Sequence, residues 1–168
     1  MSGVYKSAGR RGQWKAEEFD GLKPTVYDWV RMAAFIDGEG CIQINPYKKT
    51  RKVQVRIVIL NTNEILPLWL QETFGGHIVP RFHSNPKWKT SYTWSCTAGR
   101  ACWILYNCLP WFLLKSSQAK LLMELQEHID SNHNGKHKRV SEEDYAYRDA
   151  IHSEIKKLNA KGPRVKEN

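Results

Sequence analysis

The segment Met32–Gly40 reads MAAFIDGEG, and it decides which fold we expect. It ends a stretch that begins at Thr25 and reads TVYDWVRMAAFIDGEG. Thr25 followed by Asp28 resembles a capping box, in which the hydroxyl and the carboxylate both satisfy free backbone N–H groups. Gly38 and Gly40 break the helical pattern, because glycine disfavours a helix interior. The segment therefore predicts a helix that begins at Thr25 and ends in two acidic residues alternating with two glycines.

Two segments with alternating polarity follow this helix. CIQIN (Cys41–Asn45) and KVQVRIVIL (Lys52–Leu60) alternate apolar and polar residues, and the basic turn PYKKTR joins them. Such alternation is typical of half-buried antiparallel strands. The side chains expected to face the core are Ile42, Ile44, Val53, Val55, Ile57 and Ile59. The side chains expected on the opposite face are Cys41, Gln43, Asn45, Tyr47, Lys52, Gln54, Arg56 and Val58.

The rest of the chain repeats this order. Asn61–Glu64 predicts the cap of a short helix through Phe74, and HIVPRFH (77–83) and SYTWSCT (91–97) read as two more strands. From Gly99 onward the pattern is helical. We therefore expect an α+β fold with the order α-β-β-α-β-β-α, an antiparallel sheet and extra C-terminal helices. Residues 25–168 should form one domain, and residues 1–24 should form a flexible basic arm.

The charge is concentrated in the predicted sheet. Lys and Arg number 26 against 17 Asp and Glu, which gives a net charge of +9. Positions 45–90 contain eight basic and two acidic residues, so this stretch carries most of the excess. Concentrated positive charge favours nucleic acid as partner, because phosphate contacts release counterions. Amide and guanidinium groups on an open sheet face match base edges in a major groove, although a solvated sheet face is a common alternative. The candidate DNA-binding residues are Gln43, Asn45, Tyr47, Lys48, Lys49, Arg51, Lys52, Gln54, Arg56, Arg81, His83, Lys87, Lys89 and Thr93.

Several other classes of protein are disfavoured. None of the four cysteines forms a C-x-x-C pair, and Cys102 and Cys108 read as reduced residues packed in the core. His133 and His137 have zinc-finger histidine spacing, but no cysteine pair precedes them. The sequence contains no apolar run near the roughly 18 residues that a membrane helix needs and no secretory signal. We therefore expect an intracellular protein without a membrane partner.

The motif and the order of elements resemble one family. Met32–Gly40 resembles the LAGLIDADG motif of homing endonucleases, and α-β-β-α-β-β-α is the core of that family. Pro110–Ala119, reading PWFLLKSSQA, is similar to the family segment in which a proline and an aromatic residue lead into a lysine. The resemblance is to the single-motif, homodimeric branch, and it extends from Thr25 to about Asp130.

The resemblance implies a metal-dependent DNA endonuclease. Glu39 would bind a divalent metal, assisted by the Gly38 carbonyl, with Mg²⁺ as cofactor and Mn²⁺ or Ca²⁺ able to replace it in binding. Mg²⁺ takes oxygen ligands and is typically held by one or two carboxylates, with phosphates and waters completing its shell. Lys115 would stabilise transition-state charge or lower the pKa of the attacking water. Asn61 stands where the family often has a water-positioning Gln.

One expected feature of the family is missing. The family tends to place a second basic residue just past the position of Asn61, and here Thr62-Asn63-Glu64 provides none. This role is then either lost or transferred to Arg56 or Lys52.

A single motif implies a homodimer on a pseudo-palindromic target in double-stranded DNA. Two copies of the helix would pack through Ala33 and Ala34, with Asp37 closing the helix end and helping the two motifs pack. Core packing within one chain is the alternative explanation of the two alanines.

Two other functions remain open at the level of sequence. The first is a non-cleaving relative, either an intron maturase that binds RNA or a DNA-binding regulator. The second is a basic α+β binding module in which the motif is accidental. Retention of both Glu39 and Lys115 favours cleavage. The compartment, whether chloroplast, mitochondrion or the cytoplasm of a bacterium or phage host, is not resolved by the sequence.

Overall fold

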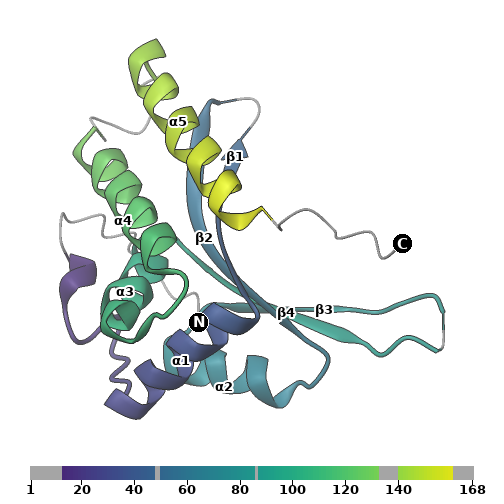
Figure 1. The fold of residues 1–168 in the computed structure, drawn as a ribbon. Coiled ribbons are helices and arrows are strands. Elements are labelled where there is room, and N and C mark those ends of the chain that lie inside the picture. Colours follow the sequence, from purple (N-terminus) through teal and green to yellow (C-terminus); the bar gives the residue numbers. More distant parts are fainter. Residues whose placement is uncertain (1–12, 48–49, 86, 133–139, 161–168) are drawn as a thin grey trace, which may run out of the picture.

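The computed structural model describes residues 13–47, 50–85, 87–132 and 140–160. Along the chain the elements are η1 (Gln13–Lys15), α1 (Val26–Gly38), β1 (Gly40–Tyr47), β2 (Lys52–Asn61), α2 (Ile65–Phe74), β3 (His77–Arg81), β4 (Ser91–Thr97), α3 (Ala98–Cys108), η2 (Leu109–Trp111), α4 (Ser116–Ser131) and α5 (Glu142–Asn159). The order predicted from the sequence, α-β-β-α-β-β-α followed by further helices, is confirmed (Figure 1).

The four strands form one antiparallel sheet in the order β1-β2-β4-β3. Gly40 pairs with Ile59 in the β1–β2 hairpin, and Ile59 pairs in turn with Trp94 of β4. The predicted alternation is confirmed, because Ile42, Ile57 and their neighbours on that face are buried. The helices pack against this buried face, whereas the other face carries the half-exposed and exposed side chains (Figure 1).

Helix α1 has the predicted capping box. The Thr25 hydroxyl accepts a hydrogen bond from the Asp28 N–H at 3.3 Å, and the Asp28 carboxylate accepts one from the Thr25 N–H at 2.8 Å. Trp29, Met32 and Ile36 follow at helical spacing and are buried against the sheet and α3. The residues of α1 thus divide between a core side and an outer side.

Residues 13–24 pack on the rest of the domain, which corrects the expectation of a flexible arm for this part of the chain; residues 1–12 lie outside the described residues. Trp14 is buried, and the Phe19 ring stacks on Trp103 of α3 with 5.4 Å between ring centroids. Asp20 pairs with the Arg100 guanidinium at 2.5 Å. Two aromatic side chains and an ion pair fix this segment on α3. Their spacing follows neither a helical nor a strand period, so the sequence did not reveal the contact.

Helix α5 lies along β1. Ile155 is buried in the core, and the Asn159 amide donates a hydrogen bond to the Ile42 carbonyl of β1 at 2.8 Å. Near its other end, Glu142 forms an ion pair with Arg51, whose guanidinium lies over the Tyr145 ring at 5.1 Å. The helix therefore contacts the β1–β2 hairpin near both of its ends, the strand β1 at one end and the turn at the other.

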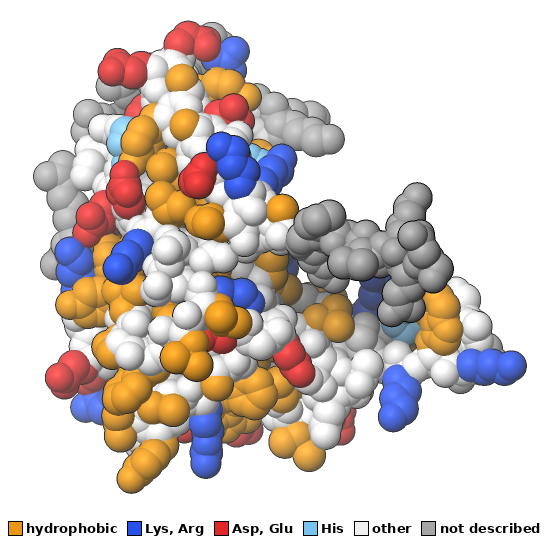
Figure 2. All heavy atoms as spheres, in the orientation of Figure 1, with side chains coloured by type: hydrophobic (Ala, Val, Ile, Leu, Met, Phe, Trp, Pro, Cys, Tyr) orange, Lys and Arg blue, Asp and Glu red, His pale blue; other side chains and the backbone are white. Residues whose placement is uncertain are grey.

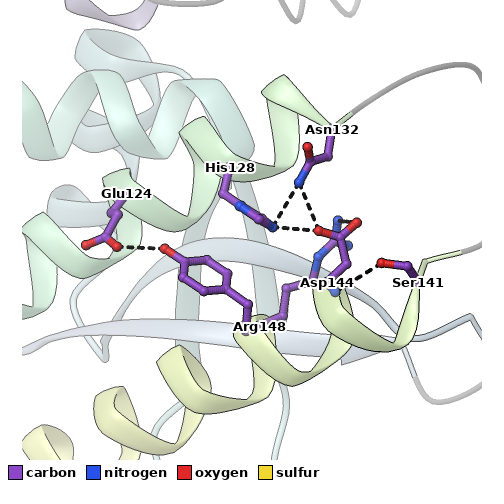
Figure 3. A network of polar contacts seen from close by, with 7 residues as sticks. Glu124, His128, Asn132, Ser141, Asp144 and Arg148 are labelled. Carbon is purple, nitrogen blue, oxygen red and sulfur yellow. Dashed lines mark hydrogen bonds and ion pairs between the residues drawn. The ribbon is translucent and has the colours of Figure 1, made fainter.

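A polar cluster joins α4 to α5 (Figure 3). The Asp144 carboxylate lies 2.7 Å from His128 Nε2 and accepts a hydrogen bond from Asn132 Nδ2 at 2.9 Å. The Tyr147 hydroxyl donates to Glu124 at 2.6 Å, and burial, together with this contact, raises the pKa of Tyr147 to about 12. His133 and His137, which have zinc-finger spacing, lie outside the described residues.

The cysteines are free; Cys102 and Cys108 are buried as expected for small core residues, and Cys96 is buried as well. Burial raises the pKa of Cys96 to about 12 and that of Cys102 and Cys108 well above the usual range. Cys41, by contrast, is exposed on β1. Among the described helices, none combines the length and the apolar character needed to cross a bilayer.

Candidate functional site

The acidic end of α1 turns directly into β1, and this close turn explains one of its glycines. A Cβ atom at Gly40 would lie 2.6 Å from the Ile36 Cα atom, closer than any side chain tolerates. Gly38, the last residue of the helix, has open space where a Cβ would project. Gly40 is thus required by packing, whereas Gly38 is exposed.

Glu39 and Asn61 lie together at one end of the β1–β2 hairpin. Glu39 is exposed at the C-terminal cap of α1, and its Oε2 atom accepts a hydrogen bond from Asn61 Nδ2 at 2.9 Å. The Asn61 side-chain oxygen accepts a hydrogen bond from the Asn63 N–H at 2.8 Å, which directs the amide N–H₂ toward Glu39. The strand pairing explains this meeting, because Gly40 pairs with Ile59 at the end of the β1–β2 hairpin.

Asp37 has a different environment. Its carboxylate accepts backbone N–H hydrogen bonds from Leu113 at 2.7 Å, Leu114 at 3.3 Å and Lys115 at 3.0 Å. A charged acceptor shared by consecutive N–H groups holds the segment before α4 against α1. Within one chain Asp37 therefore connects the end of α1 to the segment before α4. Its predicted place in a dimer interface stays a prediction.

Lys115 completes the same contact in the opposite direction. Its Nζ atom donates to the carbonyls of Ile36, Asp37 and Gly40, at 2.5, 3.0 and 2.6 Å. An ammonium group has three N–H donors, and all are used. Burial lowers the pKa of Lys115, and the nearby charge of Asp37 partly offsets this. The catalytic role that the resemblance implies for Lys115 stays a prediction; in the structure Lys115 caps the end of α1.

The donors at the end of α1 could provide part of the coordination shell of a magnesium ion. No cluster of three or more His, Cys, Asp or Glu side chains occurs among the described residues. What the end of α1 offers is one exposed carboxylate, Glu39, next to the exposed residue Gly38. Mg²⁺ commonly takes only one or two carboxylates and keeps waters and phosphate oxygens as its other ligands. The chemistry of these donors suits such an ion if a second copy or a nucleic acid supplies further oxygens.

One of the two alanines predicted for a dimer interface is misplaced. Ala33 has no exposed surface, because it packs in the core of its own chain. Ala34 is exposed, and it falls on an exposed line at i, i+4 spacing with Val26, Val30 and Gly38. The outer side of α1 therefore contains Ala34 but not Ala33, and the exposed side chains of Tyr27 and Arg31 lie beside this line.

Most of the candidate DNA-binding residues share the open face of the sheet. The strand register places Gln43, Arg56 and Thr97 in one row and Asn45 and Gln54 in the next. The predicted residues on this face are Gln43, Asn45, Tyr47, Lys52, Gln54, Arg56, Thr93 and, at the end of β3, Arg81. His83, Lys87 and Lys89 lie in the connection between β3 and β4, and Lys48 and Lys49 lie outside the described residues.

Three of the basic residues have distinct surroundings. Arg51 forms an exposed ion pair with Glu142, and its predicted contact with DNA stays a prediction. Arg56 donates to the Ser95 hydroxyl at 3.1 Å on the open face, whereas Asn61, five residues along β2, faces the opposite side. By the same alternation Lys52 also faces away. Neither Arg56 nor Lys52 thus supplies the basic residue that the sequence lacks after Asn61.

Comparison by sequence finds no matching protein-family model and no matching curated protein. Comparison by structure finds clear similarities. The homing endonuclease I-CvuI, crystallised with its DNA target in the presence of Ca, matches with a TM-score of 0.62 and 19% identity, over 83% of this chain and 85% of that one. I-Vdi141I, an archaeal intron-encoded homing endonuclease complexed with DNA, matches with a TM-score of 0.61 and 14% identity, over 84% and 89% of the two chains. The LAGLIDADG homing endonuclease I-GzeII, in complex with a DNA target, matches with a TM-score of 0.53 and 18% identity, over 84% of this chain but 45% of its own. With its motif at the end of α1 and its sheet open on one face, this chain therefore has the fold of the LAGLIDADG homing endonucleases.

Proposed function

We propose that the protein is a site-specific, metal-dependent endonuclease that cleaves double-stranded DNA as a homodimer. The observation that carries this proposal is the exposed Glu39 carboxylate, held by Asn61 at the end of a sheet whose open face is polar and basic. The structural neighbours crystallised with DNA support nucleic acid as the ligand. A polar sheet face of this kind suits the major groove, where amide and guanidinium groups distinguish base pairs.

The metal would be held by Glu39 and the Gly38 carbonyl. When bound, a divalent ion supplies activation of a water and neutralisation of charge on the phosphate. Asn61 orients the Glu39 carboxylate through its hydrogen bond. Lys115 offsets the partial negative charge of the last carbonyls of α1, which the helix dipole concentrates beside Glu39. We therefore assign Lys115 as a positioning residue, which holds the end of α1 next to Glu39.

Two features support a homodimer. At the end of α1, one chain offers one exposed carboxylate, that of Glu39, whereas cleavage of a duplex requires chemistry on two strands. In addition, this chain corresponds to only 45% of I-GzeII but to 85% of I-CvuI, so the longer neighbour has room for two such units. The exposed line through Val30 and Ala34 would form the contact, extended by Leu113 and Leu114, which are 91% and 72% exposed next to the end of α1. A two-fold axis there would join two sheets and match a pseudo-palindromic target.

The test compares the wild type with Glu39→Gln and with a control, Glu143→Gln, which changes an exposed glutamate on α5. Each is incubated with Mg²⁺ and a DNA library, and double-strand ends are sequenced. We expect specific cuts by the wild type and the control, and a rate lower by about 10³-fold or more for Glu39→Gln, since metal-assisted charge stabilisation contributes several kcal/mol. Binding should survive the change. Cleavage by Glu39→Gln at the wild-type rate would refute the site.

The dimer has its own test. Analytical ultracentrifugation of the wild type should show a species of twice the 19.6 kDa chain mass. Ala34→Glu should shift it toward the monomer, because two like charges would meet across the axis. Ala34→Ser, a small polar change, is the matched control and should stay dimeric. A wild type that remains a monomer with and without DNA would contradict the proposal.

A further inference from the structure

The connection between β3 and β4 carries two exposed aromatic rings at its tip. Phe82 is 77% exposed and Trp88 is 64% exposed, although both are large apolar side chains. Neither belongs to the hydrophobic core that the described residues form. Figure 2 shows hydrophobic surface at this projecting end of the molecule, with Lys and Arg side chains beside it. Exposed apolar surface rimmed by charge marks a contact site more often than chance.

The tip has a defined local structure. The Asn85 side-chain oxygen accepts a hydrogen bond from the Lys87 N–H at 3.0 Å, and its backbone carbonyl accepts one from the Trp88 N–H at 3.0 Å. The His83 ring packs edge-on against Trp88, with 5.3 Å between ring centroids. Trp88 is thus supported by the hairpin and still has most of its surface in solvent.

The charge around the two rings identifies the kind of partner. Arg81, Lys87 and Lys89 are exposed beside them. The sequence contains no Asp or Glu from position 73 to position 123, so no acidic neighbour in the sequence offsets this charge. Duplex DNA presents both negative charge and apolar surface, through its phosphates, its sugars and base edges such as the thymine methyl group. The open sheet face runs along β3 and β4 into this tip, so a duplex on that face would approach the rings.

We propose that Phe82 and Trp88 form an apolar anchor for DNA, which contacts the sugar and base surfaces of the duplex beyond the part that the sheet face covers. This inference rests on the proposed DNA binding and adds two residues that were not among those predicted to bind DNA. Aromatic contacts with bases add affinity that does not depend on counterion release, whereas Lys and Arg contacts do. Affinity measured across a salt series therefore separates the two kinds of contact.

The experiment uses the full chain with Glu39→Gln as parent, so that the DNA stays intact. The probe is a fluorescent duplex selected by this parent from a randomised pool. Binding is followed by anisotropy at several KCl concentrations. Trp88→Ala should weaken binding about 10-fold or more at every salt concentration, as expected when a large apolar side chain loses its buried contact with sugars and base edges. The slope of log affinity against log salt should stay unchanged. Trp88→Phe should restore most of the affinity.

Two controls complete the design. Lys87→Ala should reduce the salt slope by about one, as expected for a phosphate contact. Tyr106→Ala changes another exposed aromatic residue, on α3, and should leave binding unchanged. Because both tip rings are exposed, the melting temperature of the tip variants should match that of the parent.

The outcomes separate this inference from the function on which it rests. Parent-like affinity of the double variant Phe82→Ala/Trp88→Ala, or a loss accompanied by a smaller salt slope, would overturn the anchor alone. A change in oligomeric state caused by Trp88→Ala would also overturn it, since the rings would then bind protein. Failure of the parent to bind any duplex would overturn the proposed function together with the anchor.

Discussion

Two carboxylates stand two positions apart at the end of α1, and their surroundings are opposite. Asp37 accepts three backbone N–H groups of the segment before α4, whereas Glu39 is exposed and is held by one side-chain amide. The intervening residue is a glycine, at which the chain leaves the helix. The acidic motif therefore combines a structural residue, Asp37, with an exposed one, Glu39, to which we assign the chemistry. Only the second acid has oxygen atoms free for a ligand.

Thiol labelling tests how exposed the chain is beside Glu39, and the rates of labelling of Cys41 and Cys108 should show the largest difference among these tests. Cys41 follows Glu39 by two positions and is exposed, whereas Cys108 is buried, with its thiol 3.7 Å from the Trp29 carbonyl. Burial, and to a lesser extent the charge of Asp37, raises the pKa of Cys108. In the native protein Cys41 should react with iodoacetamide on the order of 10³-fold faster or more, because labelling of a buried thiol requires opening of the structure. Mass spectrometry of digested samples measures both rates. Similar rates would contradict the exposure of Cys41 next to Glu39 and the burial of Cys108.

Removal of the carboxylates should affect stability unequally. Asp37→Ala should lower the free energy of unfolding by about 2–3 kcal/mol, because three backbone donors lose a charged acceptor. Glu39→Ala should change it by less than about 0.5 kcal/mol, as is usual for an exposed position. Urea unfolding followed by circular dichroism measures both, with Asp37→Asn as an intermediate control. Equal losses for the two alanine variants would refute the division of roles.

Lys115→Met tests the other half of the intrachain contact. Loss of three hydrogen bonds from the ammonium should lower the free energy of unfolding by about 1–2 kcal/mol, less than for Asp37 because burial of the charge already has a cost. The folded pKa of Lys115 lies below its ordinary value of 10.5. The burial penalty is therefore fully present below the folded pKa and is relieved as pH rises toward 10.5. The stability of the wild type relative to Lys115→Met should rise over that window, and a relative decline would show that the charged form is favoured.

Asn61→Ala should give the smallest effect on stability, within about 0.5 kcal/mol, because its contact with Glu39 is exposed. If the proposed cleavage is observed, its rate should fall about 10-fold while DNA affinity stays the same, since the amide only orients Glu39. Asn61→Gln should recover part of the rate. A large loss of affinity in Asn61→Ala would place this residue in DNA binding instead.

The sequence predicted the elements whose signals are local. The capping box at Thr25, the alternation in β1 and β2 and the strand Ser91–Thr97 depend on spacing within a few residues, and all three are confirmed. The meeting of Glu39 and Asn61 could be expected because a hairpin brings the ends of its two strands together.

The contacts that were missed connect distant positions. The side chain of Asp37 reaches backbone groups 76 to 78 residues away, and Glu142 lies 91 residues from Arg51. Backbone acceptors and donors leave no pattern in side-chain identity, so nothing in the sequence marks them as partners. Ala33 and Ala34 illustrate the same limit, because adjacent residues on a helix point about 100° apart and only the packed structure shows which one is buried.

The hydrogen bond from Asn159 to the Ile42 carbonyl helps to cover an edge of the sheet that could otherwise pair with another molecule. An unpaired edge strand can accept a strand from another molecule and so begin aggregation. In this sheet α5 lies along one edge strand, β1, while the other, β3, is five residues long and contains Pro80, which lacks an N–H donor. With both margins protected in this way, growth of the sheet by uncontrolled strand addition is disfavoured, and the broad polar face can remain exposed in solution without becoming a template for self-assembly.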